Sequence, residues 1–350
     1  MVIGACGFGS TGSSAVTDYL KEFDSFQVLD KIEFTWVSSV DGLIDLEYHL
    51  FHPHNRTGDS MWAIERYKKL AFRKAATLKR AGMSEEAIKR SIEGFLASII
   101  QTSWKWNRPG AHRTFWDKQM RKFLGKIDFV SRWEIKNGRH WNKYPFEDVY
   151  LSVMPERFDE AARKHVREML EGIGADFSKP IILDQPFSGN NPQACFKFFD
   201  DPYAVVVDRD PRDNYVFGRT RLLGTAHLMP IDPVDEFVKY YRALRKNQPY
   251  TEPHERVLCI KFEDMVYHYD ETTAKLREFF NLPDNPNPKS IFDPAISMPN
   301  TQVWKRFPQF AKDVEYIEKE LPEYLFDYTG CPEPDPNGKM FFGKSPKNKN

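Results

Sequence analysis

The sequence predicts an α/β fold, in which a central parallel sheet carries helices on both faces and a large helical insertion. Three observations predict it. Short apolar runs of strand length recur along the 350 residues and alternate with amphipathic segments. A glycine-rich turn joins the first apolar run to the first helix. A helical pattern then occupies roughly 110 residues before the apolar runs resume.

The elements of the sheet follow in order. The first strand is predicted at residues 2–6, and an amphipathic helix follows at 13–23 because its apolar side chains recur at helical spacing. A second strand is expected at 26–30. The remaining strands are expected at 180–184, 203–207 and 256–261. In such sheets ligands bind at the carboxyl ends of the strands.

The insertion is expected to be helical from about 60 to 175. Ser84 has the residue type and position of a helix N-cap, and residues 155–172 form another predicted helix. We expect a single domain at 1–330, including the insertion at about 50–178. Residues 331–350 are rich in Pro, Lys and Asn and are expected to be a loose tail.

Composition limits the function classes. Lys+Arg and Asp+Glu number 50 each, which argues against a general polyanion binder, so no nucleic-acid partner is expected. No apolar run approaches the length of a membrane span, and the N-terminus shows no basic leader. The expected location is the cytoplasm. The composition does not indicate an oligomeric state.

Cysteine and histidine spacing predicts no metal site. The four cysteines are scattered without a CxxC pair, and Cys6 and Cys259 lie in apolar runs that should bury them. His49, His52 and His54 lack a companion carboxylate pattern.

The turn after the first strand has the GxxxxG frame of a P-loop. Its glycines let main-chain N–H groups turn inward, its hydroxyls add donors, and the following helix N-terminus adds positive potential. Ser13 stands where an ATPase loop carries lysine, which weakens an ATPase interpretation. The predicted anion-binding residues are Gly7, Gly9, Ser10, Thr11, Gly12, Ser13 and Ser14.

A second motif runs from Val205 to Asp213. A buried strand ends at Arg209, an Asp-Pro turn follows, and Arg-Asp opens a helix. A guanidinium at a strand's carboxyl end can hold a phosphate through two hydrogen bonds. We expect Asp213 to anchor the turn.

These two motifs resemble the family of sulfotransferases that use 3′-phosphoadenosine 5′-phosphosulfate (PAPS), with the character of a bacterial-type member. In that family a P-loop-like segment binds the 5′-phosphosulfate and a strand ending in Arg-x-Pro-x-Asp helps to bind the 3′-phosphate. Two further segments agree in order: residues 257–265 and residues 297–328. The resemblance implies that Trp304 stacks on adenine, while Lys305 and Arg306 meet the 3′-phosphate.

The sequence departs from the family pattern at two positions. Ser10 replaces the loop lysine, and the candidates for its role are Lys31, Lys305, Arg306 or an arginine of the insertion. Phe217 replaces a serine that follows the motif arginine, and Arg219 or Thr220 could bind the phosphate instead.

The acceptor's proton requires a base. Glu33 resembles the glutamate base of glycan-acting members, and Asp184 is the second candidate. Lys31 would share the face of Glu33 on an extended strand and meet the sulfuryl oxygens.

Residues 101–143 combine eleven Lys and Arg with three Asp and Glu and five of the eight tryptophans. Such a surface suits a sugar ring, an anionic glycan or a nucleic-acid base, and a helical cap with its own tryptophan core explains it equally well. The predicted function is therefore PAPS-dependent sulfotransfer to a hydroxyl or amine of a small-molecule or glycan acceptor, without metal. The alternatives are an ATP-dependent phosphotransferase and a non-catalytic nucleotide- or glycan-binding protein.

Overall fold

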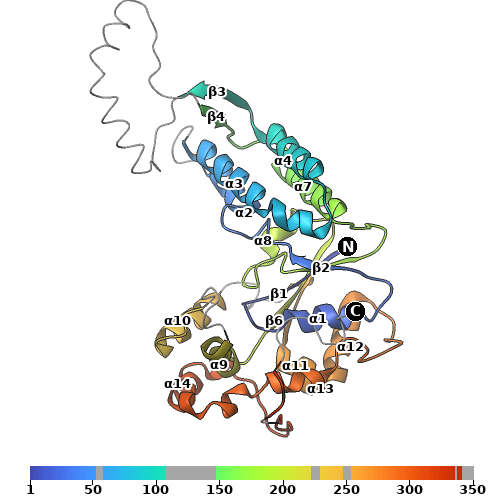
Figure 1. Cartoon of the computed structure of the whole chain (residues 1–350), viewed down its shortest axis with the longest axis vertical. Coiled ribbons are helices and arrows are strands. Elements are labelled where there is room, and N and C mark those ends of the chain that lie inside the picture. Colours follow the sequence, from blue (N-terminus) through green and yellow to red (C-terminus); the bar gives the residue numbers. More distant parts are fainter. Residues whose placement is uncertain (53–57, 107–146, 222–228, 247–253, 336, 341–350) are drawn as a thin grey trace, which may run out of the picture.

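The computed structural model of the chain describes residues 1–350 except 53–57, 107–146, 222–228, 247–253, 336 and 341–350 (Figure 1). The insertion residues 107–146, including most of the tryptophan-rich stretch and His112 and His140, therefore lie outside the described residues, as does His54.

A five-stranded parallel sheet forms the centre of the fold. Its strand order is β2-β5-β1-β6-β7, so the first strand lies in the middle. The strands are β1 (Val2–Gly7), β2 (Gln27–Glu33), β5 (Ile181–Asp184), β6 (Pro202–Asp208) and β7 (Val257–Lys261). The predicted strands match these within a few residues.

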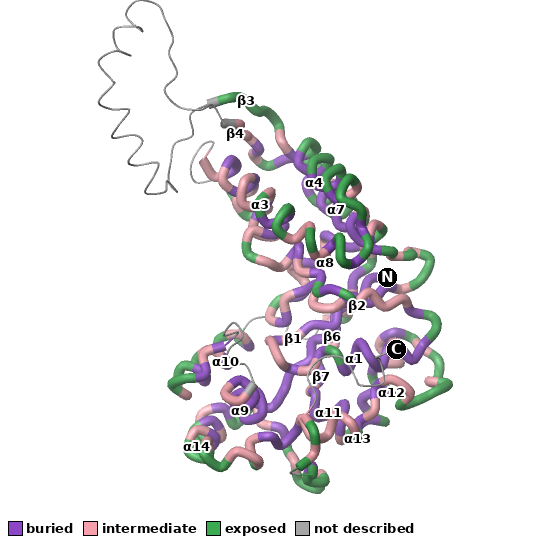
Figure 2. The backbone as a smooth tube through the Cα atoms, in the orientation of Figure 1, coloured by how far each residue is buried: buried purple, intermediate pink, exposed green. Residues whose placement is uncertain are grey.

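Both faces of the sheet are buried, as expected of parallel strands. Alternate residues of β1 face opposite sides: Ile3 and Ala5 join one apolar cluster, while Val2 and Cys6 join the other. The first cluster packs against α1 (Ser13–Leu20), α11 (Phe262–Tyr267) and α12 (Tyr269–Phe280). In Figure 2 the central strands are purple, the colour of buried residues, and they lie between these helices and the upper part of the molecule, which consists mainly of helices.

The other face carries the helices between β2 and β5. These are α2 (Leu43–Phe51), α3 (Gly58–Ala81), α4 (Glu85–Ile99) and α7 (Phe158–Gly172). Ser84 caps α4 as predicted, because its hydroxyl accepts a hydrogen bond from the Ala87 N–H at 3.2 Å. An antiparallel pair, β3 (Thr102–Trp106) and β4 (Glu147–Leu151), also stands in this part, where the sequence indicated only helices.

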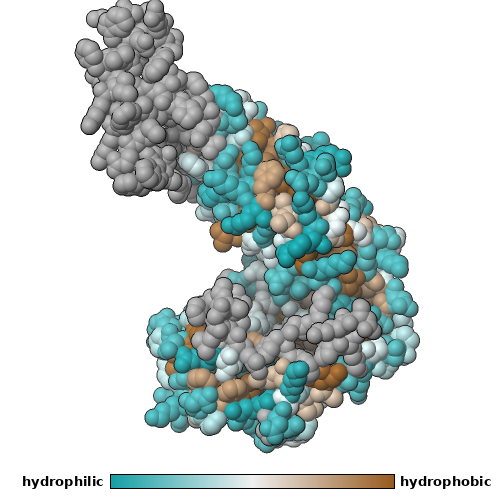
Figure 3. All heavy atoms as spheres, in the orientation of Figure 1, coloured by the Kyte–Doolittle hydropathy of each residue, from teal (hydrophilic) through white to brown (hydrophobic). Residues whose placement is uncertain are grey.

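Beyond β5 the chain continues through the short α8 (Gln193–Phe196) into β6. After β6, three helices form a third apolar cluster: α9 (Pro211–Arg221), α10 (Val234–Leu244) and α14 (Ala311–Glu320). The short α13 (Pro294–Ser297) and 3-10 turns between residues 298 and 324 lead into and out of α14. In Figure 3 the surface is hollowed between this lobe and the helical part that contains α3 and α4.

The predictions for the buried cysteines and for the loose C-terminal tail can be compared with the structure. Cys6 is buried, whereas Cys259 is exposed on the edge strand β7, so the prediction for Cys259 is wrong. The first part of the tail, which was expected to be loose, is hydrogen-bonded to the fold. The main-chain oxygens of Pro332 and Gly338 accept hydrogen bonds from Gln302 and Arg306. Within the described ranges, no helix combines the length and apolar character needed to cross a membrane.

Candidate functional site

Residues 7–14 form a tight turn between β1 and α1, at the carboxyl end of the central strand. Gly9 and Gly12 adopt φ angles of 86° and 92°, a region that favours glycine, and Ser10 adopts 56°. The Thr11 hydroxyl accepts a hydrogen bond from the Phe8 main-chain N–H at 3.1 Å. The loop is thus held in a curled form by its own backbone and one hydroxyl.

The loop is packed closely from two sides. A Cβ added at Gly7 would lie 2.2 Å from Thr11 Oγ1, and one at Gly12 would lie 2.5 Å from the Phe262 ring. A Cβ on Gly189 would approach the Gly7 carbonyl oxygen to 2.4 Å. These positions leave no room for a side chain, so the neighbouring segments fix the path of the loop.

The loop leads directly into the N-terminus of α1. Gly12 is the N-cap residue and no side chain caps the first turn. The Ala15 N–H donates to the Gly12 carbonyl oxygen, so the N–H groups of Ser13 and Ser14 precede the first hydrogen bond of the helix. Such groups, with the helix dipole, attract anions. The Ser13 hydroxyl accepts a hydrogen bond from Gln185 Nε2 at 2.8 Å, and Ser14 is exposed.

Arg209 brings a cation to this loop. Its guanidinium donates hydrogen bonds to the Ser10 carbonyl oxygen, at 3.1 Å, and to the Asn300 carbonyl oxygen. The residue is 4% exposed and lies between the rings of Phe217 and Phe262. Its Nε–H is buried and has no partner among the described residues. A donor left unpaired beside an anion-binding turn fits an anionic ligand.

A buried acidic cluster lies behind Arg209. It consists of Asp210, Asp213 and Glu263, each fully buried. Asp213 accepts hydrogen bonds from the main-chain N–H groups of Gln302 and Val303, so it anchors the segment after residue 300. Burial and repulsion from Asp210 raise the pKa of Asp213. Burial and repulsion from both aspartates likewise raise the pKa of Glu263.

The other predicted cofactor residues are engaged elsewhere. Arg219 pairs with Asp232 at 2.9 Å, and Lys305 pairs with Glu333 at 2.5 Å. Arg306 donates to the Pro299 and Gly338 carbonyl oxygens. The Trp304 ring lies against the Arg212 guanidinium, 4.7 Å from ring centroid to carbon, and its indole N–H is buried without a partner in the described parts of the chain. None of these four side chains makes a hydrogen bond to the loop within the described residues.

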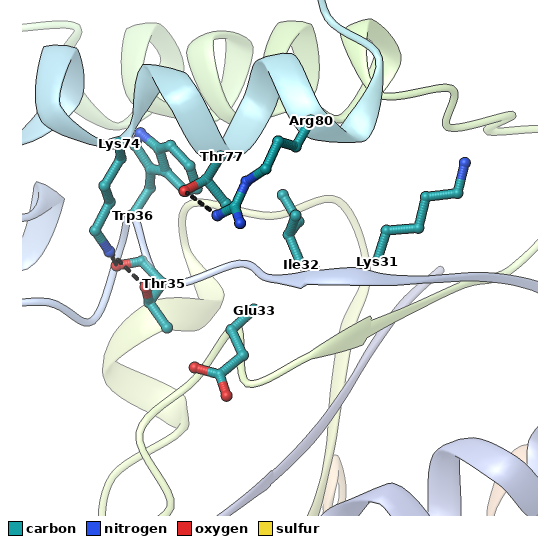
Figure 4. Close-up of a pocket in the computed structure, with 8 residues that line it drawn as sticks. All are labelled: Lys31, Ile32, Glu33, Thr35, Trp36, Lys74, Thr77 and Arg80. Atoms are coloured by element: carbon teal, nitrogen blue, oxygen red, sulfur yellow. Dashed lines mark hydrogen bonds between the residues drawn. The ribbon is translucent and has the colours of Figure 1, made fainter. Parts of the chain in front are cut away.

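The candidate base stands on the neighbouring strands. Glu33 pairs with Asp184 of β5, which pairs in turn with Ala5 of β1, just before the loop begins. Glu33 is exposed at the end of β2. Figure 4 shows Lys31 on the opposite side of the strand from Glu33. The pairing of β2 with β5 is irregular between Leu29 and Glu33, which breaks the alternation that predicted a shared face.

A cavity of about 420 Å³ opens beside Glu33, between the end of β2 and the last turns of α3 (Figure 4). Lys74 and Arg80 of α3 line it together with Lys31 and Glu33. Lys74 donates to the Thr35 carbonyl oxygen at 2.9 Å, and mainly burial lowers its pKa to about 8.

Sequence reasoning missed Lys74, Arg80 and Asn214. Asn214 Nδ2 donates to the Gly9 carbonyl oxygen at 3.2 Å, and its position next to the motif at 205–213 is a signal that could have found it. Lys74 and Arg80 carry no such signal, because only tertiary packing brings α3 over β2. The described residues contain no group of three or more His, Cys, Asp or Glu that could hold a metal ion.

Comparisons with known proteins show the family of the chain. A model of the sulfotransferase family matches residues 5–286, which includes the loop, Glu33, Asp184 and Arg209. A search of the curated proteins found no match.

Two solved structures resemble the chain at 13% identity. The sulfotransferase domain from the curacin biosynthetic pathway aligns over 81% of this chain and 74% of its own length, with a TM-score of 0.31. The sulfotransferase domain from the Synechococcus PCC 7002 olefin synthase aligns over 92% and 94%, with a TM-score of 0.37. Neither likeness is close enough to define details of the site.

Proposed function

Because this chain belongs to the sulfotransferase family, we propose that it transfers a sulfuryl group from PAPS to a hydroxyl or amine of an acceptor, with a saccharide favoured over a phenol or steroid. The observation that carries the proposal is the junction of the loop at 7–14 with Arg209. There, unpaired N–H groups of a helix N-terminus and an unpaired guanidinium N–H lie together.

The residues at this junction suit an anionic nucleotide. Uncapped N–H groups at the start of α1 favour a phosphosulfate group through hydrogen bonds and the helix dipole. Arg209 supplies positive charge where the family pattern has a loop lysine, since its guanidinium contacts the backbone of Ser10. PAPS, when bound, supplies the sulfuryl group and a phosphate leaving group.

In the proposed reaction Glu33 is the general base. Its exposed carboxylate stands at the carboxyl edge of the sheet, across β5 from the strand that leads into the loop. As the acceptor oxygen bonds to sulfur and the bond from sulfur to the phosphate oxygen breaks, the acceptor's proton passes to this carboxylate. A positioned base with an open path to a cavity suits this role.

The test is binding of the product nucleotide, adenosine 3′,5′-bisphosphate (PAP), without metal. A ligand bound only by the native state at about 100 times its Kd stabilises it by roughly 2.7 kcal/mol. We expect PAP with chelator to raise the Tm, and ATP with Mg²⁺ to leave it unchanged. Arg209→Ala should lose about 2–5 kcal/mol of PAP affinity, as truncation of a buried charged contact does.

Arg90→Ala serves as a control for this experiment, because Arg90 is exposed on α4, in the helical part that carries none of the predicted cofactor residues. Its PAP affinity should stay within a few-fold of the unchanged protein. Stabilisation by ATP with Mg²⁺ but not by PAP would contradict the proposed donor. An Arg209→Ala protein that folds and binds PAP normally would remove Arg209 from the site.

A further inference from the structure

The cavity beside Glu33 has an unusual balance of charge. Its lining carries three cationic side chains, Lys31, Lys74 and Arg80, and one carboxylate, Glu33 (Figure 4). None of the three cations forms an ion pair with a carboxylate of the described residues. Unpaired positive charge gathered in one hollow raises the local concentration of anions and favours their binding.

The hydrogen-bond partners of Lys74 are neutral, which strengthens the case for an anion in the cavity. The ammonium donates hydrogen bonds to the Thr35 carbonyl oxygen, the Thr35 hydroxyl and the Ser39 hydroxyl. All three acceptors are uncharged, so they fix the ammonium without cancelling its charge. Burial and the neighbouring Arg73 lower the pKa of Lys74, and Glu33 opposes this shift. An anion in the cavity would stabilise the charged form of Lys74.

A further donor is left over in the same lining. Trp36 is fully buried, and its indole N–H has no hydrogen-bond partner among the described residues. Arg80 is exposed, and its guanidinium reaches only the Thr77 hydroxyl at 3.4 Å, which leaves its donor fork available.

We propose that the acceptor is an acidic saccharide, whose carboxylate or sulfate is held by Arg80 and Lys74 in this cavity while the hydroxyl to be modified faces Glu33. This inference rests on the proposed function, because it takes the cavity as the acceptor site. The chemistry required is one anionic group within a sugar ring's reach of a hydroxyl. A neutral phenol or steroid would leave the three cations without a balancing negative charge from the acceptor.

The experiment compares two polymers that differ only in charge. Unsulfated chondroitin carries a carboxylate on every second sugar, and carboxyl-reduced chondroitin carries none. Binding of each is measured by calorimetry in the presence of saturating PAP, and transfer is measured with ³⁵S-labelled PAPS. We expect chondroitin to bind at least about 10-fold more tightly than its reduced form, as a charge-assisted contact requires.

Arg80→Gln should abolish most of this preference, while PAP affinity stays unchanged. Arg90→Gln, the same change at an exposed position of α4 outside the cavity, is the matched control. Lys74→Met should weaken chondroitin binding in the same direction, with folding checked by circular dichroism. A KM for chondroitin that rises in Arg80→Gln, without a matching fall in kcat, indicates binding of the acceptor's anion.

The outcomes separate the two proposals. Normal PAP binding with equal affinity for both polymers, with no affinity for either, or with Arg80→Gln behaving like Arg90→Gln would overturn the acidic acceptor alone. Failure of PAP to bind, with no ³⁵S transferred to any acceptor, would overturn the proposed function itself.

Discussion

At the scale of single residues, Glu33 carries the chemical part of the proposal. Glu33→Gln keeps the shape of the side chain but cannot accept a proton, so turnover should fall by about 100-fold or more, the usual contribution of a positioned base. PAP affinity should not change, because the residue does not touch the loop among the described contacts. Sulfotransfer kinetics and PAP titration of the variant measure both quantities.

Asp184→Asn is the companion variant, because Asp184 pairs directly with Glu33 across the two strands. We expect it to cost less than Glu33→Gln. Normal turnover in Glu33→Gln combined with an inactive Asp184→Asn would transfer the role of base to Asp184.

Glu263 gives a prediction about pH. Burial and the nearby aspartates raise its pKa from 4.5 to about 8, so the folded state holds a proton that the unfolded chain has lost. The stability contributed by this proton is complete below pH 4.5 and is lost as pH rises towards 8. Glu263→Gln, which is permanently neutral, should therefore flatten the decline in the free energy of unfolding over this range.

Urea denaturation between pH 5 and 8 measures this effect. Glu263 Oε1 accepts a hydrogen bond from the Asp210 N–H at 3.0 Å, and the glutamine oxygen can replace it. Glu278→Gln, at an exposed carboxylate on the following helix α12, provides the control for a change of net charge. An identical pH slope in both variants would show that Glu263 is ionised in the folded state.

At the scale of elements, the loop at 7–14 depends on close packing against α11. Gly9 and Gly12 both have positive φ, so alanine strains either position by about 1–2 kcal/mol. Only at Gly12 would the new Cβ also meet a neighbour, the Phe262 ring at 2.5 Å. Gly12→Ala should therefore destabilise more than Gly9→Ala, by about 1–3 kcal/mol for the overpacking.

Gly12→Ala should also weaken PAP binding more, since the Phe262 ring lies 5.3 Å from the Arg209 guanidinium carbon and would be displaced towards it. Urea denaturation and PAP titration compare the two variants. Equal losses of stability in both would mean that the loop, rather than the ring, absorbs the added methyl group.

The helices α3, α4 and α7 are joined by a buried chain of hydrogen bonds. His165 of α7 contacts the Tyr67 hydroxyl at 2.7 Å and the Ser91 hydroxyl at 2.8 Å, and Ser91 donates to Glu168. Because Ser91 uses its single proton on Glu168, His165 Nδ1–H must donate to Ser91, and Nε2 then accepts from Tyr67. Burial lowers the pKa of His165 to about 3, so the ring is neutral.

His165→Leu leaves the Tyr67 hydroxyl buried without a partner, which should cost about 2–4 kcal/mol of stability. Adding Tyr67→Phe should recover part of the loss, because the unpaired hydroxyl is then absent. The unchanged protein should lose stability as pH falls below 6.5, where only the unfolded chain protonates this histidine. Urea denaturation of the single and double variants checks the first effect, and its pH dependence checks the second.

At the scale of the whole molecule, the sequence was sufficient for the parallel sheet and its flanking helices. The apolar runs and the glycine-rich turn are local signals. They are enough to identify the buried strands and the helices between them. The pairing order of the strands and the β3–β4 pair were not predicted, because they depend on contacts between residues far apart in the chain. The single domain at 1–330, the cytoplasmic location and the acceptor class stay predictions.

In the site, too, the parts that depend on local motifs were predictable, and the parts that depend on tertiary packing were not. The loop and Arg209 lie in contact, as two motifs at the carboxyl edge of one sheet should. The cationic cavity was invisible in the sequence, because Lys74 and Arg80 come to line the same cavity as Glu33 only through the packing of α3 over β2. The expected place of Lys31 depended on regular strand alternation, which the irregular pairing of β2 removes.

The central place of β1 has a consequence for folding during synthesis. Val2 pairs with Ile181 on one side and with Pro202 on the other, so the first strand has no neighbour until more than half of the chain has been made. The helices α3, α4 and α7 pack on one another and are made before β5, so they can form earlier. Until β5 and β6 arrive, Val2–Gly7 is an apolar segment with two open edges. Slow translation after β2 would prolong this exposure, and chaperones that bind short extended apolar segments would protect the nascent chain at its first strand.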